Sequence, residues 1–251
     1  MAKVISTIRG AVREVLLGRP EKRNALDGEM LAAIEAAFSS RPAAHERVAV
    51  IRAAGEVFCA GLDLTERART AHAPSPIEPM LSAIERYPLP VVAVVQGDAL
   101  AGGNELALHC DLVVASTAAR FGMPLARIGL APSWFLAKKL LDSAGPVTVR
   151  RMLLLGEPLA AQRLYDLGVI SHIAAPQDLA SVAAGVIERL IDNAPLSLAA
   201  MKALIVRAMS ARETIAHDDV DRLVEEVRRS EDAQEGMAAR LARRRPSFKG
   251  S

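Results

Sequence analysis

The sequence has few aromatic side chains, only two cysteines and no long apolar run. Phe, Trp and Tyr together make up 3% of the 251 residues. Cys59 and Cys110 provide neither a disulfide framework nor the spacing of a zinc site. The longest apolar runs, such as 91–95 and 112–115, fall far short of the roughly 18–20 residues that span a membrane. We therefore expect a reduced, cytoplasmic protein with no membrane-spanning segment.

A strong excess of one charge is also absent. The formal net charge is +2, which argues against nucleic acid as a partner. The only dense basic run covers 240–245, and we interpret it as the solvated end of a helix. The five histidines form no HExxH or paired-ligand pattern, so we expect no metal site. Charges at Arg9 and Arg13 leave no apolar secretory segment at the N-terminus.

Two familiar catalytic motifs are missing. No G-x-G-x-x-G run with a later acidic residue appears, which excludes the dinucleotide-binding fingerprint. No G-x-S-x-G run appears either, which excludes the serine nucleophile elbow. Cys59 remains as a possible nucleophile, although a small buried thiol is the better interpretation.

The composition is that of a folded α/β domain, with 51% hydrophobic and 24% charged residues. Strands alternate with helices up to about residue 116, three helices and a short strand follow residue 133, and helices dominate from residue 178. The predicted strands cover 3–10, 11–18, 47–53, 90–96, 111–116 and 169–174. The predicted helices cover 27–38, 77–86, 104–110, 135–141, 147–155, 160–167, 178–191, 196–210 and 218–243. The proline-rich stretch 65–79 is predicted to be a mobile surface loop.

A glycine pair marks the most promising place for chemistry. The apolar strand 91–95 leads through Gly102 and Gly103 into a predicted helix, and 55–64 is a second strand that ends in a small-residue turn. Amide groups at a helix N-terminus are unpaired and lie at the positive end of the helix dipole. Glycine also allows a ligand to approach the backbone closely. Such a turn suits an anion or a developing oxyanion, although a purely structural turn would give the same pattern.

Several ordered segments together resemble the crotonase family, the enoyl-CoA hydratases and isomerases. The resemblance runs from Val4 to about Gly250. The segments that carry it are 19–26, 58–64, 90–97, 100–106, 110–124 and 245–248. It implies an α/β fold, a crotonase-like spiral of ββα units over 1–192, with a C-terminal helical trimerisation region over 193–251. It further implies a homotrimer or a dimer of trimers.

The resemblance also implies a substrate and its binding residues. Family members bind acyl-CoA or enoyl-CoA thioesters, so coenzyme A enters as part of the substrate and no separate cofactor is expected. The matching oxyanion donors are the backbone amides of Leu62 and Gly102. The residues expected along the CoA and acyl groups are Lys22, Arg23, Ala25, Ala60, Asp63, Leu64, Gly103, Pro124, Leu125, Ser133 and Trp134. The alternative to CoA contact for Lys22 and Arg23 is a solvent-exposed turn, and the alternative for Trp134 is packing in the core.

One of the two catalytic glutamates of the family is missing. The first falls on Glu105, whose alternative role is to complement the helix dipole. The second belongs in a G-x-P-E run, where this chain reads 122–125 as Gly-Met-Pro-Leu. Leu125 transfers no proton, and loss of one acid/base group typically costs roughly 10²–10⁴ in rate. Hydration by the usual pair of glutamates is therefore not expected.

Three functions are compatible with this sequence. The first is an enoyl-CoA hydratase or isomerase of fatty acid metabolism, a lyase or isomerase that uses Glu105 as its acid/base. The second is a non-catalytic protein that binds and carries acyl-CoA. The third is another crotonase reaction, such as thioester hydrolysis or carbon–carbon cleavage. We favour the first.

Overall fold

The computed structural model describes residues 2–69, 75–210 and 215–250. Six strands form the main sheet, in the order β1-β2-β3-β4-β6-β9, and all neighbours are parallel except β1 and β2. These strands are β1 (Val4–Arg9), β2 (Val12–Leu17), β3 (Val48–Ala53), β4 (Val91–Val95), β6 (Leu112–Ser116) and β9 (His172–Ala174). A smaller sheet joins β5 (Ala99–Leu100), β7 (Arg120–Gly122) and β8 (Leu159–Ala160).

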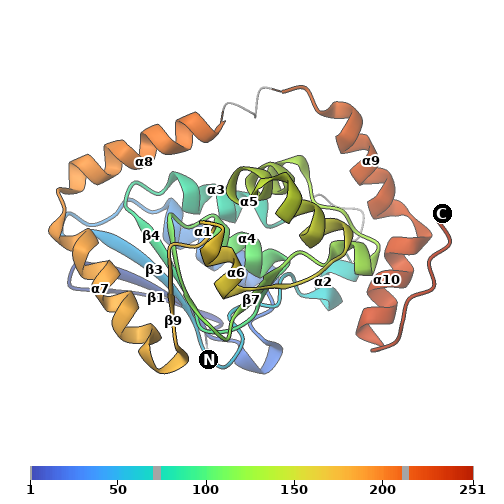
Figure 1. Ribbon diagram of the computed structural model, residues 1–251, viewed down its shortest axis with the longest axis horizontal. Helices are drawn as coiled ribbons and strands as arrows, with labels where there is room; N and C mark the ends of the chain where they lie inside the picture. The colour runs from blue at the N-terminus through green and yellow to red at the C-terminus, as the bar shows by residue number, and fades with distance from the viewer. Residues whose placement is uncertain (1, 70–74, 211–214, 251) are drawn as a thin grey trace.

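Helices cover both faces of the main sheet and continue beyond it (Figure 1). The α-helices are α1 (Gly28–Ser39), α2 (Leu64–Arg69), α3 (Glu78–Arg86), α4 (Gly102–Leu108), α5 (Trp134–Leu154), α6 (Ala161–Asp166), α7 (Leu179–Asp192), α8 (Pro195–Met209), α9 (Asp218–Arg229) and α10 (Glu231–Leu241). Short 3-10 turns are η1 (Pro20–Lys22), η2 (Leu125–Ile128) and η3 (Pro176–Asp178). In the described part of the chain, no helix is both long and apolar enough to cross a membrane.

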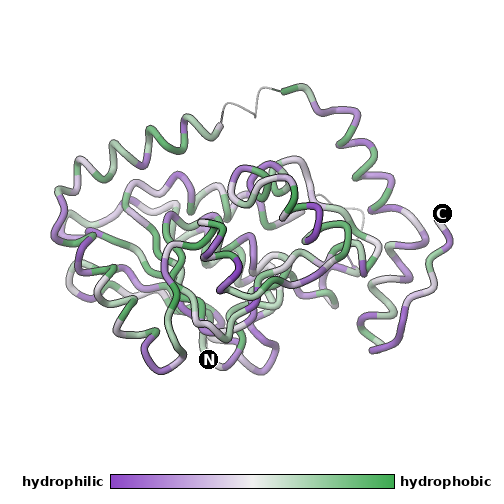
Figure 2. The backbone as a smooth tube through the Cα atoms, in the orientation of Figure 1, coloured by the Kyte–Doolittle hydropathy of each residue, from purple (hydrophilic) through white to green (hydrophobic). Residues whose placement is uncertain are grey.

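Two apolar cores lie on opposite faces of the main sheet. Because successive side chains of a strand point to opposite faces, β3 sends Ala49 and Ile51 into one core, and Val48 and Val50 into the other. The larger core also contains the buried faces of α1, α3, α4 and α5, and the smaller lies under α7. The tube in Figure 2 is correspondingly hydrophobic along the central strands and mainly hydrophilic along α9.

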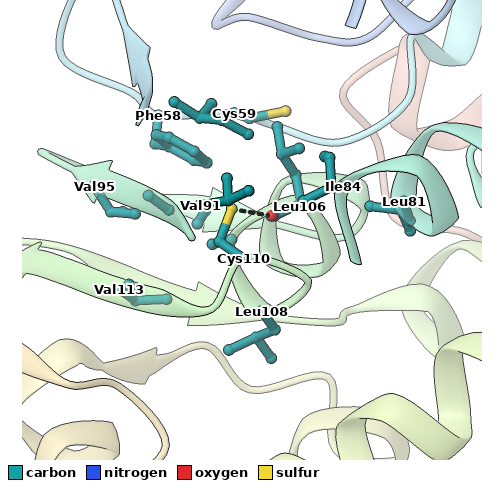
Figure 3. Close-up of a cluster of buried hydrophobic side chains, with 14 of the residues drawn as sticks. Phe58, Cys59, Leu81, Ile84, Val91, Val95, Leu106, Leu108, Cys110 and Val113 are labelled. Carbon is teal, nitrogen blue, oxygen red and sulfur yellow. Dashed lines mark hydrogen bonds between the residues drawn. The ribbon is translucent and has the colours of Figure 1, made fainter. Parts of the chain in front are cut away.

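Helix α4 is fixed within the larger core. Leu106 and Cys110 pack near Phe58, and the Cys110 thiol donates a hydrogen bond to the Leu106 carbonyl at 3.3 Å (Figure 3). A Cβ atom on Gly103 would lie 2.2 Å from the Cys59 carbonyl oxygen, so only glycine fits there. This close packing fixes the N-terminus of α4 beside the loop after Cys59.

Most predicted elements are present, and three boundaries need correction. The strand predicted over 55–64 is wrong: only isolated bridges form there, at Cys59 and Leu62, because Gly55 and Gly61 turn the chain with φ of 79° and 96°. The stretch 65–79 is not one loop: α2 occupies its first part, because the Asp63 carboxylate accepts a hydrogen bond from the Thr65 amide at 3.0 Å and caps the helix. Residues 70–74 of that stretch lie outside the described residues. The predicted helix 218–243 is two helices, since the Ser230 hydroxyl accepts from Ala233 N and begins α10. Helices 135–141 and 147–155 form one element, α5, with a non-helical break at Gly145.

The C-terminal helices differ in how they contact the core. Helix α8 leaves several large apolar side chains exposed, among them Leu196, Met201, Leu204 and Ile205. Helix α10 packs closely on η2 and contacts α2. A Cβ atom on Gly236 would lie 2.3 Å from the Ile128 carbonyl carbon. The predicted oligomerisation through 193–251 stays a prediction, whereas α10 is part of the wall described below.

Candidate functional site

A cavity of about 410 Å³ lies between the core and the C-terminal helices. Helix α2, strand β5, the start of α4 and the turn η2 form its inner wall, and residues of α9, α10 and the following segment close the other side. Its inner wall is mainly aliphatic. The larger apolar side chains that line it are Leu62, Leu64, Ile77, Leu100, Met123, Leu125, Ile128, Leu130 and Leu136.

The backbone N–H of Leu62 points away from the segment around Leu26, which pairs with it. Leu26 pairs with Leu62 in a parallel bridge, in which Leu26 N donates to Gly61 O and Asp63 N donates to Leu26 O, both at 2.8 Å. In such a pairing the N–H of the middle residue points to the other side. Leu62 itself lines the cavity. Among the described residues, its amide has no hydrogen-bond acceptor.

The second free amide belongs to Gly102, the first residue of α4. The first amides of a helix have no partner within the helix, and no acceptor for Gly102 N exists in the described segments. A Cβ atom on Gly102 would lie 3.5 Å from Leu62 N, and one on Gly61 would lie 3.1 Å from Gly102 N. The two glycines therefore bring both amides to one small space, where two donors suit an oxygen that carries negative charge.

Ala101 turns the chain so that this arrangement is possible. Its φ of 48° and ψ of −119° are unusual for a residue with a side chain. Ala101 N donates to Gly122 O at 2.8 Å, and Ala101 O accepts from Glu105 N at 3.1 Å. Such backbone strain costs of order 1–3 kcal/mol and clusters at functional sites.

Glu105 lies one helical turn beyond Gly102 and is completely buried. It is not among the residues that line the cavity. Neither carboxyl oxygen has a hydrogen-bond partner in the part of the chain that the structure describes. Burial raises the pKa of Glu105 to about 8. The side chain is therefore mainly a neutral carboxylic acid near pH 7.

His109, which caps the C-terminus of α4, lies close to Glu105. Its Nδ1 donates to the Glu105 carbonyl oxygen at 2.8 Å and lies 3.7 Å from the Glu105 carboxylate oxygen Oε2. The imidazole stacks on Phe135, with ring centroids 5.2 Å apart. Burial lowers the pKa of His109 to about 4, so the ring is neutral. Glu105 and His109 are therefore both uncharged and do not form an ion pair.

Some predicted binding residues line the cavity and others do not. Ala60, Leu64, Pro124, Leu125 and Ser133 join Leu62 and Gly102 in its wall. Trp134 does not: it stacks on His217, with ring centroids 5.1 Å apart. Gly103 packs on Cys59 instead of facing the cavity.

The segment around η1 lies beside the cavity but contributes no lining side chain. Lys22 and Arg23 are exposed, and Ala25 is partly buried. Arg23 O accepts from Ala60 N at 3.0 Å, which places this segment next to the wall. The Asp63 carboxylate accepts from Arg19 at 2.9 Å and therefore holds the loop together. Contact of these four residues with CoA stays a prediction.

Sequence analysis did not predict Arg67, Arg228, Arg240 and Arg244 at the cavity. The run 240–245, interpreted as a solvated helix end, contributes Arg240, Arg244 and Arg245 to the wall. Arg67 of α2, Arg127 of η2 and Arg228 of α9 complete the set. The only signal for these arginines in the sequence was the basic run 240–245 itself. Its position over a cavity depends on the packing of α10 against η2, which no local pattern shows.

The cysteines are buried thiols, as expected. Burial raises the pKa of Cys59 to about 12 and also raises that of Cys110, so neither forms a thiolate readily. Among the described residues, no three His, Cys, Asp or Glu side chains form a cluster suited to a metal ion.

Comparisons with known proteins define the class. The family model described as Enoyl-CoA hydratase/isomerase matches residues 7–251. A carnitinyl-CoA dehydratase of Salmonella arizonae is 34% identical over 254 residues, covering 97% of both chains. A 2,3-dehydroadipyl-CoA hydratase of Escherichia coli is 32% identical over 258 residues, covering 100% of both. The chain belongs to the enoyl-CoA hydratase/isomerase family of the crotonase superfamily.

Solved structures support the same fold. A methylmalonyl-CoA decarboxylase in complex with 2-nitronate-propionyl-CoA aligns with a TM-score of 0.91 and 26% identity, covering 99% of both chains. An enoyl-CoA hydratase of Mycobacterium avium subsp. paratuberculosis aligns with a TM-score of 0.86 and 27% identity, also covering 99% of both. The expected crotonase fold is confirmed.

Proposed function

We propose that this protein is an enzyme that acts on acyl-CoA thioesters through an enolate bound by Leu62 and Gly102. The observation that carries the proposal is the meeting of two unpaired amides at one aliphatic cavity. When a thioester becomes an enolate, negative charge develops on its carbonyl oxygen. Fixed donors at low dielectric stabilise that charge more than the neutral ground state, and each is worth roughly 10²–10³ in rate.

The rim of the cavity suits the phosphate groups of CoA. Arg240 and Arg245 are exposed side chains in its wall, both from the C-terminal segment. Guanidinium groups bind phosphate through paired, charge-assisted hydrogen bonds. The apolar acyl and pantetheine portions would lie along the aliphatic wall. Lys22 and Arg23, beside this rim, are the predicted further contacts.

Glu105 is the proposed proton donor and acceptor. A carboxyl group whose pKa is near 8 holds a proton at neutral pH and exchanges it readily with a carbon acid. The proposal requires the side chain to reach the cavity from its buried position behind Gly102. Leu125 occupies the position of the second family glutamate, so one group handles the proton. This suits proton relocation along the acyl chain better than addition of water.

The decisive experiment follows exchange of the α-proton. Butyryl-CoA in D₂O should gain deuterium, measured by mass spectrometry, with the wild type and not with Glu105→Gln. Absorbance assays with trans-2-enoyl-CoA and trans-3-enoyl-CoA then separate hydration from isomerisation. Saturable CoA-thioester binding without exchange or turnover would instead identify a carrier. Cytoplasmic location, a trimeric or hexameric state and a role in fatty acid metabolism remain predictions.

Carbon–carbon cleavage is the second candidate, favoured by the apolar side chain of Leu125 in the cavity wall. Decarboxylation of a 2-carboxyacyl-CoA breaks the bond between Cα and the carboxylate, and the electron pair of that bond forms the enolate. No base is needed. Neutral Glu105 would give its proton to Cα and regain one from water. Release of CO₂ from methylmalonyl-CoA by the wild type, lost in Gly102→Ala, tests this candidate.

A further inference from the structure

The direction of the Leu62 N–H is set by the peptide group to which it belongs. Gly61 C=O and Leu62 N–H are the two ends of that group, and in a trans peptide they point in opposite directions. Gly61 O accepts a hydrogen bond from Leu26 N at 2.8 Å. This bond therefore holds the Leu62 N–H on the side away from Leu26. Any movement of the segment around Leu26 would turn the proposed oxyanion donor.

One guanidinium group joins the two paired segments. Arg19 Nη1 donates to Ala25 O at 3.0 Å and lies 3.1 Å from Oδ2 of Asp27. These two acceptors flank Leu26 in the sequence. The same nitrogen donates to the Asp63 carboxylate of the other segment at 2.9 Å, and Asp63 N donates to Leu26 O at 2.8 Å. Arg19 therefore bridges the two segments whose pairing orients the oxyanion amide.

The bridge is largely shielded from solvent. The side chains of Arg19, Asp27 and Asp63 are 14%, 11% and 16% exposed, respectively. Burial acts to raise the pKa of Asp63, but hydrogen bonds, the one from Arg19 first among them, outweigh it and hold that pKa below its usual value. Because partly buried ion pairs are screened much less than exposed ones, this pair fixes the positions of its partners.

The turn that carries Arg19 is itself anchored in the core. The fully buried Asn24 accepts from Arg19 N at 2.9 Å and donates to Ala54 O and Val57 O, both at 2.9 Å. Asn24 has a φ of 52°, a left-handed conformation in which asparagine is enriched. Arg19 is not among the described residues that line the cavity. It therefore acts through the backbone near Leu62 and not by contact with a substrate.

We propose that Arg19 is a positioning residue for catalysis, which holds the Leu62 amide in the direction that an enolate oxygen needs. The inference rests on the proposed acyl-CoA function and adds to it a residue that does not touch the substrate. A misplacement of about 1 Å at a catalytic group can cost roughly 10² in rate. Asp63, which the family resemblance predicts as a CoA contact, acts in this proposal as the partner of Arg19.

The test observes the carbonyl group of a bound ligand. Butyryl-CoA labelled with ¹³C at the thioester carbon is bound to the protein, and its carbonyl stretch is measured by isotope-edited infrared difference spectroscopy. Hydrogen bonds to the oxygen lower this frequency, so the wild type should lower it below its value in water. Arg19→Gln should reverse most of that shift. It should also reduce kcat for α-proton exchange by roughly 10- to 100-fold with little change in KM.

Further variants identify the interaction that is lost. Arg19→Lys keeps the charge and should recover part of the shift and of kcat. Asp63→Asn keeps a side chain that can cap α2 but removes the charge that faces Arg19, so it should reproduce the loss. The double variant should be no worse than either single one, because both remove the same ion pair. Asp63→Asn answers the question if Arg19→Gln does not fold.

Two controls separate positioning from folding and from recognition of CoA. S-butyl-CoA is a methyl-terminated thioether without a carbonyl group, and calorimetry should give it the same affinity for the wild type and Arg19→Gln. Arg47→Gln is the matched variant, since Arg47 is also half-buried and donates to the backbone carbonyls of Ala44 and Glu46. It should leave the carbonyl frequency, kcat and both affinities unchanged.

Each contrary outcome overturns a distinct claim. A wild-type carbonyl frequency and kcat in folded Arg19→Gln would overturn the inference alone, because the oxyanion site is then intact without the bridge. Equal loss of affinity for butyryl-CoA and S-butyl-CoA would also overturn it, since Arg19 would then support CoA binding as a whole. If the wild type leaves the carbonyl frequency at its value in water, or binds neither ligand, the proposed function and the inference are both wrong.

Discussion

Oε2 of Glu105 lies 3.7 Å from Nδ1 of His109, and both side chains are fully buried. A charged pair at this distance would be strongly attracted, yet burial moves the two pKa values in opposite directions and leaves both groups neutral. Helix α4 thus holds a protonated acid close to the oxyanion amides. The proposed function uses this proton once the side chain reaches the cavity.

The first prediction concerns stability and pH. Burial raises the pKa of Glu105 from 4.5 to about 8, so the stability it contributes is complete below pH 4.5 and is lost as the pH rises to 8. Glu105→Gln cannot ionise. It should therefore melt above the wild type, by a margin that grows from pH 5 to pH 8 and corresponds to a few kcal/mol at pH 8.

Thermal unfolding at pH 5, 6.5 and 8 measures this margin. Glu188→Gln, an exposed position on α7, is the matched control and should show no pH-dependent difference. A constant or shrinking margin for Glu105→Gln would mean that the carboxyl group is ionised in the folded protein.

A second prediction concerns the space between the two amides. In Gly102→Ala the new methyl group lies 3.5 Å from Leu62 N and 2.7 Å from Ile77 Cδ1, where a thioester oxygen would bind. We expect thioester affinity and α-proton exchange to fall by about 10² or more. Gly185→Ala on α7, with no atom within 4 Å of the new Cβ, should leave both unchanged. Normal exchange in Gly102→Ala would place the oxyanion elsewhere.

A third prediction concerns the missing glutamate. Leu125 begins η2 and lines the cavity, so Leu125→Glu places a carboxylate where the family resemblance predicts the second glutamate. Hydration of trans-2-butenoyl-CoA should increase about tenfold or more over the wild type. Leu125→Gln has the same size without the charge and should give no increase. Equal rates in the two variants would show that polarity, rather than proton transfer, limits hydration.

A fourth prediction concerns the docking of α10. In Gly236→Val a side chain would overlap the Ile128 carbonyl group, so α10 must move away from η2. Affinity for CoA thioethers should fall by about tenfold or more, because Arg240 and Arg245 move with the helix. Ala238→Val, exposed on the same helix, should bind normally. Calorimetry with one methyl-terminated thioether measures both. Normal binding in Gly236→Val would mean that α10 does not hold the ligand.

The sequence predicted local structure well where a local cause exists. The Asp27 side chain does accept from Met30 N and begin α1, and the Gly145 break does lie between the two predicted halves of α5. The helix over 218–243 was predicted without its break, because the polar pattern is continuous across Ser230. The cap at Ser230 is as local as that at Asp27, and it was missed because no apolar residue marks the start of α10.

The candidate site was predictable only in part. The resemblance to the crotonase family predicted Leu62 and Gly102 as the oxyanion donors, and both residues line the cavity. The presence of Arg67 and Arg228 in one cavity wall could not be predicted, since it depends on the packing of α10 against α2. Burial of Glu105 behind the wall likewise depends on how α4 packs against α5, beyond the reach of residue spacing.

The close backbone contact of Gly236 with Ile128 makes the tail of the chain a part of the binding cavity. If the proposed thioester binds here, its affinity and the local unfolding of α9 and α10 are thermodynamically linked, because both helices contribute to the cavity wall. A bound thioester should slow hydrogen exchange in α10 and protect it from proteases. Conversely, any partner that draws these helices away from the core would release the ligand without touching the oxyanion amides.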